Sequence, residues 1–233
     1  MRRPNTAATM PAVSSAVIVS YDGTANDEDA VAFGRLLARA GARLSLAYVR
    51  HSRESTHERE LVVAHDAERM LERGAAALED PDVPRHVLWG ASTPSALEDL
   101  AAEQGAGLIV FGSDYRTSPG RAEPGTSAQQ LLDGGPVAIA VAASGLRAAD
   151  AELRTIAVAA GSENGVATET AEILAAQLGC AIVPRAYDAD LIVVGSRADG
   201  TPGRIELSGA ARAALNAVRG SVLVLPSSTV LAL

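Results

Sequence analysis

The sequence LIVFGS at residues 108–113 returns almost unchanged as LIVVGS at residues 191–196, 83 positions further along the chain. In each copy a short apolar run leads into Gly-Ser, which is typical of a buried strand that ends in a loop. The likeness continues past the strand, because PGRAE at 119–123 returns as PGRIE at 202–206. Six of the twelve positions from 112 to 123 are identical at this offset. The sequence therefore contains a duplication.

The start of the chain is repeated as well, but at a different offset. TIAVAAGS at 155–162 parallels 17–24 at an offset of 138, so 138 − 83 = 55 residues are missing inside the second copy. The missing part corresponds to a long helix, the third strand and a third helix. In their place stand only residues 183–190, fewer than the dozen or so that a parallel crossover usually needs. We therefore predict a reduced second copy, in which 180–187 need not form a regular strand.

Strand-like apolar runs alternate with helix-like stretches, which predicts an α/β protein with a parallel sheet. Asn26 and Asp27 are expected to cap the first helix, Ser55 with Glu58 the second, and Thr93 before Pro94 the third. Periodicity places Leu61 on the buried face of the second helix, with Leu71, Ala75 and Leu78. In the first copy, strands are expected at 16–24, 42–49, 84–90, 107–113 and 136–142, and helices at 26–40, 55–79, 93–104 and from 127.

Composition excludes several classes of function. All 20 basic residues are arginine, so mechanisms that need a lysine, including Schiff-base chemistry and a P-loop, are excluded. The net charge of −8 argues against a nucleic-acid surface, and no apolar run is long enough to predict a membrane span. The four histidines lack metal-ligand spacing. The single cysteine, Cys180, fits a reducing cytoplasm.

At this point the chain resembles the universal stress protein family, whose phosphate motif is glycine, two residues, glycine, nine residues, and glycine with serine or threonine. Here Gly112 fits, Tyr115 stands where the second glycine belongs, and Gly125-Thr126 fits at full spacing. The resemblance implies a doubly wound parallel five-stranded sheet of the adenine-nucleotide α-hydrolase-like class. It further implies that Asp22 and Val49 contact adenosine, while Gly112, Gly125, Thr126 and Ser127 hold the phosphates of ATP or AMP.

The resemblance covers residues 15–143, and residues 155–225 in shortened form. We accordingly predict a disordered tail at 1–14, a universal-stress-type domain at 15–146, and a truncated second domain at 147–233. In the family the fifth strands pair edge to edge between domains. Here 137–142 and 221–225 are expected to pair within one chain, and a homodimer is also possible.

The physical chemistry of the loop supports an anion site independently of the family. A helix N-terminus carries partial positive charge, and Gly125-Thr126-Ser127 opens such a helix. Arg116 and Arg121 are expected to add positive charge from the loop. Tyr115 is the departure, because a glycine with positive φ cannot become tyrosine without strain or a changed loop path.

Three hypotheses about function follow. The first is a cytoplasmic stress-response module that binds ATP or AMP, with magnesium, without turnover. The second is a nucleotide-free interaction or scaffold protein with a degenerate pocket and no cofactor, which Tyr115 favours. The third is an enzyme of the related adenine-nucleotide class, so slow ATP hydrolysis stays open. In the second copy Ala160 and Ala198 replace the acid and the second glycine, so we expect a structural partner there.

Overall fold

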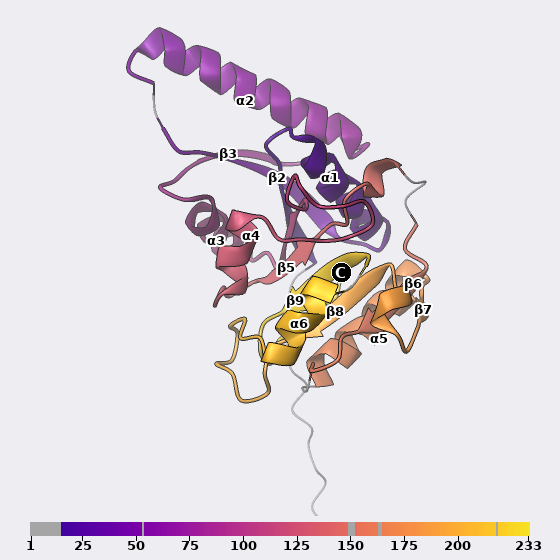
Figure 1. The fold of residues 1–233 in the computed structure, drawn as a ribbon. Helices are drawn as coiled ribbons and strands as arrows, with labels where there is room; N and C mark the ends of the chain where they lie inside the picture. Colours follow the sequence, from indigo (N-terminus) through magenta and orange to yellow (C-terminus); the bar gives the residue numbers. More distant parts are fainter. Residues whose placement is uncertain (1–14, 53, 149–151, 163–164, 218) are drawn as a thin grey trace, which may run out of the picture.

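The computed structural model describes residues 15–52, 54–148, 152–162, 165–217 and 219–233, and the predicted tail at 1–14 lies outside them. Nine strands form one sheet in the order β3-β2-β1-β4-β5-β9-β8-β6-β7 (Figure 1). The strands are β1 (Ala16–Ser20), β2 (Arg43–Arg50), β3 (Arg85–Trp89), β4 (Leu108–Phe111), β5 (Ala138–Val141), β6 (Thr155–Val158), β7 (Ala181–Ile182), β8 (Leu191–Gly195) and β9 (Ser221–Leu225). The helices are α1 (Ala25–Arg39), α2 (His57–Ala77), α3 (Thr93–Gln104), α4 (Thr126–Leu132), α5 (Gly165–Leu178) and α6 (Gly209–Ala217), with 3₁₀ turns η1 (Leu146–Ala148) and η2 (Ala186–Asp188).

The sheet consists of two parallel halves joined by one antiparallel contact. Strands β1 to β5 are parallel in the order 3-2-1-4-5, which confirms the predicted doubly wound arrangement. The antiparallel contact pairs β5 with β9, with Ala140 opposite Leu223, so the predicted pairing within one chain is confirmed. In the second half β6, β7, β8 and β9 take the places of β1, β2, β4 and β5. Strand β7 has only two residues and is followed by η2, so 180–187 does not form a full-length strand, in agreement with the predicted reduction of the second copy.

The loops after β4 and β8 are held by the same hydrogen bonds at the same offset of 83. Ser113 donates its hydroxyl to the Ala142 carbonyl at 2.6 Å, and Ser196 donates to Leu225 at 2.7 Å. Gly120 and Gly203 have φ of +77° and +75°, which only glycine adopts without strain. Further pairs of backbone bonds repeat. Among them are Asp114 N–Glu123 O with Arg197 N–Glu206 O, Gly120 N–Ser144 O with Gly203 N–Ser227 O, and Ser144 N–Arg121 O with Ser227 N–Arg204 O. The repeated residues are thus those that build this loop.

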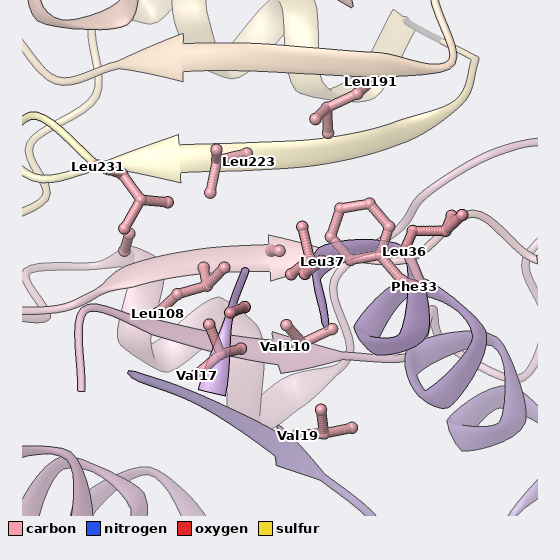
Figure 2. Close-up of a cluster of buried hydrophobic side chains, with 14 of the residues drawn as sticks. Val17, Val19, Phe33, Leu36, Leu37, Leu108, Val110, Leu191, Leu223 and Leu231 are labelled. Atoms are coloured by element: carbon pink, nitrogen blue, oxygen red, sulfur yellow. The ribbon is translucent and has the colours of Figure 1, made fainter. Parts of the chain in front are cut away.

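One apolar core on each face of the sheet runs through both halves. Alternate strand residues point to opposite faces, so Val17 and Val19 lie on the face covered by α1, α2 and α5, and Ile18 lies on the face covered by α3, α4 and α6. On the first face, Phe33 and Leu37 of α1 belong to the same cluster as Leu191 and Leu223 of the second half (Figure 2). The two halves therefore share a core. Among the described helices, none combines the length and the apolar character that crossing a lipid bilayer would require.

The helix caps differ from the predicted ones by one to three residues. Thr24 precedes α1, while the predicted caps Asn26 and Asp27 lie in its first turn. Their side chains are engaged elsewhere, by the Ser113 carbonyl and the Asp22 amide, which explains why they do not cap the helix.

For α2 and α3 the cap lies one residue from the predicted position. Thr56, not Ser55, caps α2 by accepting a bond from the Arg59 amide. Ser92, not Thr93, caps α3, since the Thr93 hydroxyl is within hydrogen-bond distance of the His51 ring.

Candidate functional site

The strand order reverses between β1 and β4, and in a doubly wound sheet ligands bind at the carboxyl ends of such strands. Asp22 follows β1 and Gly112 follows β4, and the two strands pair with Val19 opposite Val110. Val49 lies near the end of β2. Ser20 of β1 is paired with Ala47 of β2, and Asp22 and Val49 each follow that pair by two residues on their own segments. The structure thus brings Asp22, Val49 and Gly112 to the ends of three neighbouring strands.

Gly112 lets α1 approach the end of β4. A Cβ atom at this position would overlap the backbone carbonyl of Asn26 in the first turn of α1. The Asn26 side chain fastens the same contact by donating to the Ser113 carbonyl at 2.7 Å. The first motif glycine therefore has a structural role, whatever else the loop binds.

Asp22 and Asp27 form an interacting pair of acidic residues beside this contact. The Asp22 amide donates to Asp27 Oδ2 at 2.5 Å, and the Thr24 amide donates to Asp22 Oδ1 at 3.0 Å. Burial, then the hydrogen bond and the charge of Asp22, raise the pKa of Asp27 to about 8. Burial pushes the pKa of Asp22 upward, but hydrogen bonds from Asp27 and Thr24 outweigh it and lower that pKa. At neutral pH, Asp27 therefore holds a proton and the exposed Asp22 is an ionised acceptor.

Tyr115 occupies its position in the loop without backbone strain. Among the described residues other than glycine, only Glu79 and Ser228 have positive φ, so the strain expected at Tyr115 is absent. The loop turns at Asp114, whose carbonyl accepts a bond from the Thr117 amide at 2.9 Å. The Tyr115 ring is 72% exposed, and the Arg116 guanidinium lies 4.8 Å from its centroid. The tyrosine side chain therefore extends into solvent.

Gly125, Thr126 and Ser127 lie together at the start of α4, as predicted. Gly125 precedes the helix with φ of −68° and supplies no capping side chain. A Cβ at Gly125 would meet nothing within 4 Å, so the fold does not require glycine there. Thr126 is exposed and Ser127 half-buried. This open start of α4 is compatible with the predicted phosphate contact.

Arg121, which was expected to add charge to the loop, instead spans the junction between the halves. Its guanidinium donates to the carbonyl of Asn216 in α6 at 2.5 Å, and its Nε lies 3.5 Å from Glu123. Arg204, its counterpart, donates to the Gly134 carbonyl just after α4 at 3.0 Å. Each arginine therefore binds the C-terminal end of a helix in the other half, where the helix dipole favours a cation. The expectation for Arg121 was wrong, because the junction determines its partner.

Asp29 is a buried carboxylate whose contacts the sequence analysis did not foresee. It is fully buried and accepts bonds from the Gly145 amide, the Arg147 amide and the Arg147 guanidinium, each at 2.9 Å. The sequence does contain a pattern that could have predicted the burial of Asp29. Asp29 precedes Phe33 by four residues and Leu36 by seven, which places it on the same apolar face of the helix. An acid on an apolar face indicates a buried partner.

Four cavities are described, with volumes from 410 to 540 Å³. The largest lies at the junction of the halves, between the end of β5 and the start of β9. None of these four is lined by any of the six predicted site residues.

Solved structures share this fold at low sequence identity. A universal stress protein from Archaeoglobus fulgidus DSM 4304 matches with a TM-score of 0.58 at 14% identity, over 91% of this chain and 98% of that one. A putative universal stress protein from Pseudomonas aeruginosa UCBPP-PA14 gives 0.60 at 15% identity, over 91% and 92% of the two chains. At such identities the likeness shows the fold alone.

Among curated proteins none matches the chain. The sequence profile of the universal stress protein family, however, matches residues 15–143. That segment is more than half of the 233 residues and contains β1 to β5, Asp22 and the loop from Gly112 to Ser127. This chain belongs to the universal stress protein family.

Proposed function

We propose that this protein is a cytoplasmic stress-response module that binds an adenine nucleotide, ATP or AMP, at the carboxyl ends of β1 and β4, beside Asp22 and Gly112, without turning it over. The observation that carries the proposal is the position of an ionised, exposed Asp22 where the strand order reverses, next to the motif loop. A carboxylate there accepts hydrogen bonds from the amino or hydroxyl groups of adenosine.

The remaining predicted residues have matching roles in this proposal. Val49 is buried and offers an apolar contact for the base, and the open start of α4 at Gly125, Thr126 and Ser127 receives the phosphates. Residues 15–146 form the binding domain, and residues 147–233 form a truncated second domain that closes the edge of β5. The absence of lysine from the sequence excludes covalent catalysis through a lysine.

The test combines direct detection of ligand with one substitution and a matched control. Nucleotide released by denaturing freshly purified protein is identified by mass spectrometry, and ATP and AMP are titrated calorimetrically with and without magnesium. Gly125→Asp puts a carboxylate beside the phosphates and should abolish binding while leaving the fold intact, because a Cβ there meets nothing within 4 Å. Gly209→Asp is the control, since it adds the same charge at the start of α6, also with nothing within 4 Å, and should leave binding unchanged. Nucleotide affinity that survives Gly125→Asp contradicts the site assignment.

A nucleotide-free interaction protein is the second candidate. The hydrogen bond from Arg121 to the Asn216 carbonyl favours this candidate, because the Arg121 guanidinium is then directed to α6 and not to the phosphate loop. Tyr115→Gly distinguishes the two candidates, since the exposed ring can be removed without opening a cavity. If the wild type binds no ATP and the variant does, the Tyr115 side chain prevents nucleotide binding by a loop that is otherwise able to bind it. If neither binds, the second candidate is supported.

A further inference from the structure

The first half of α2 has an exposed apolar pair that the core does not use. Leu61, predicted to face the core, is 57% exposed, and Val62 is 60% exposed. The buried residues of α2 (Ala67, Leu71, Gly74 and Ala75) all lie in its second half. In Figure 1 the N-terminal half of α2 extends along the outside of the molecule, away from the sheet. The prediction for Leu61 failed because periodicity does not show where the supporting sheet ends.

The exposed pair lies in a stripe with a charge at each end. At about 100° per residue, Glu58, Leu61, Val62, His65 and Arg69 share one side of the helix, opposite the buried residues. All five are exposed. Glu58 and Arg69 are about 16 Å apart along the axis at the usual rise per residue. No hydrogen bond or ion pair within the described part of the chain engages their side chains. We call these five residues the α2 stripe.

We propose that the α2 stripe is a self-association surface and that its occupant is the α2 stripe of a second copy of this chain, packed antiparallel about a two-fold axis. With the axis passing between residues 63 and 64, Glu58 faces Arg69 of the partner subunit, and the reverse contact is identical. Val62 then faces the partner's His65, with the leucines flanking this central contact. The stripe is thus complementary to itself in charge, which is what an isologous interface requires.

The pairing of the strands argues that two copies of the chain do not associate through the edge of β5. Strand β5 is already paired with β9 of the same chain, so that edge is closed to another copy. The α2 stripe belongs to neither the junction nor the candidate site beside Asp22. The inference therefore stands or fails independently of nucleotide binding.

Charge reversal tests the proposal. Sedimentation velocity of the full chain at low salt, over a wide range of protein concentrations, should show a monomer–dimer equilibrium. Glu58→Arg and Arg69→Glu should each weaken the dimer by at least about tenfold, because each places like charges opposite one another twice. The double variant E58R/R69E restores both pairs and should recover the wild-type dimer. Glu103→Arg, at an exposed position on α3, is the control and should have no effect.

Every other outcome overturns the proposal. A chain that stays monomeric at all concentrations has no such surface. A dimer that neither single reversal weakens forms elsewhere, for example through an open sheet edge. A double variant that stays as weak as the singles shows that Glu58 and Arg69 do not face each other. Because all substituted side chains are exposed, unchanged circular dichroism and thermal midpoints should separate these outcomes from unfolding.

Discussion

The buried carboxylate of Asp29 in α1 accepts hydrogen bonds from the backbone amide and the guanidinium of Arg147, 118 residues further along the chain. The Arg147 guanidinium also donates to the carbonyl of Ala25, the first residue of α1. The helix beside the candidate site is therefore fastened directly to the segment that leads into the second half.

Asp29→Ala should lower the free energy of unfolding by about 3 kcal/mol, because two backbone amides and a guanidinium lose their shared acceptor. Urea denaturation measures the change. Asp133→Ala is the control, since Asp133 pairs with Arg212 at an exposed position, and it should cost under about 1 kcal/mol. Equal losses for the two variants would contradict the structural role of Asp29.

Gly112→Ala should destabilise the protein by about 3 kcal/mol or prevent folding, since its Cβ would overlap the Asn26 backbone and α1 would have to move. Gly125→Ala meets open space at φ of −68° and should be neutral, or more stable by up to about 1 kcal/mol. Thermal unfolding of the two variants checks this difference. A tolerated alanine at 112 would mean that α1 does not approach β4 this closely.

The pH dependence of stability should follow Asp27. Its pKa is raised in the folded protein, so between its ordinary value and about 8 the folded state binds more protons than the unfolded state. The contribution of Asp27 is therefore present at low pH and is lost as the pH rises through this window. The lowered pKa of Asp22 has the opposite effect. Asp22 stabilises the folded protein at pH values above the ordinary pKa of an aspartate, and this contribution is lost as the pH falls through the lowered pKa.

Asp27→Asn tests this coupling, because the amide cannot ionise. Urea midpoints should fall less steeply from about pH 5 to about pH 9 in the variant than in the wild type, and the variant should be the more stable of the two at the alkaline end. Parallel curves for the two proteins would show that Asp27 titrates normally.

Much of the fold could be predicted from the sequence, because each buried strand is an apolar run between turn residues. The resemblance to the family, in which fifth strands pair between domains, then predicted the pairing of β5 with β9, which occupy the fifth position of their copies. Side-chain contacts across the junction could not be predicted. Arg121 was assigned to the loop, whereas its partner Asn216 is 95 residues away. Leu61 follows the correct helical period but lies beyond the sheet that would bury it.

In the candidate site, too, some features could be predicted from the sequence and others could not. The phosphate motif of the family that the chain resembles located Gly112 and the Gly125–Ser127 segment at the two ends of one loop. The spacing does not show that Gly112 serves the packing of α1 while Gly125 has free space around it. Nor does it show that the Asp22 amide donates to the Asp27 carboxyl, since this depends on the turn between β1 and α1. Local patterns predict elements, whereas interactions between elements require the assembled backbone.

The shared core predicts that both halves unfold together. Phe33 of α1 is 1% exposed and belongs to one cluster with Leu191 and Leu223 of the second half (Figure 2). Phe33→Ala should therefore cost about 3–5 kcal/mol and shift one cooperative transition rather than unfold the first half alone. Urea unfolding followed by far-ultraviolet circular dichroism and by the fluorescence of Trp89 in β3 provides the measurement, because the first signal reports on both halves and the second on the first half. Coincident curves are expected for the wild type and the variant, whereas a separated fluorescence transition would show that the halves are stabilised independently despite the continuous sheet.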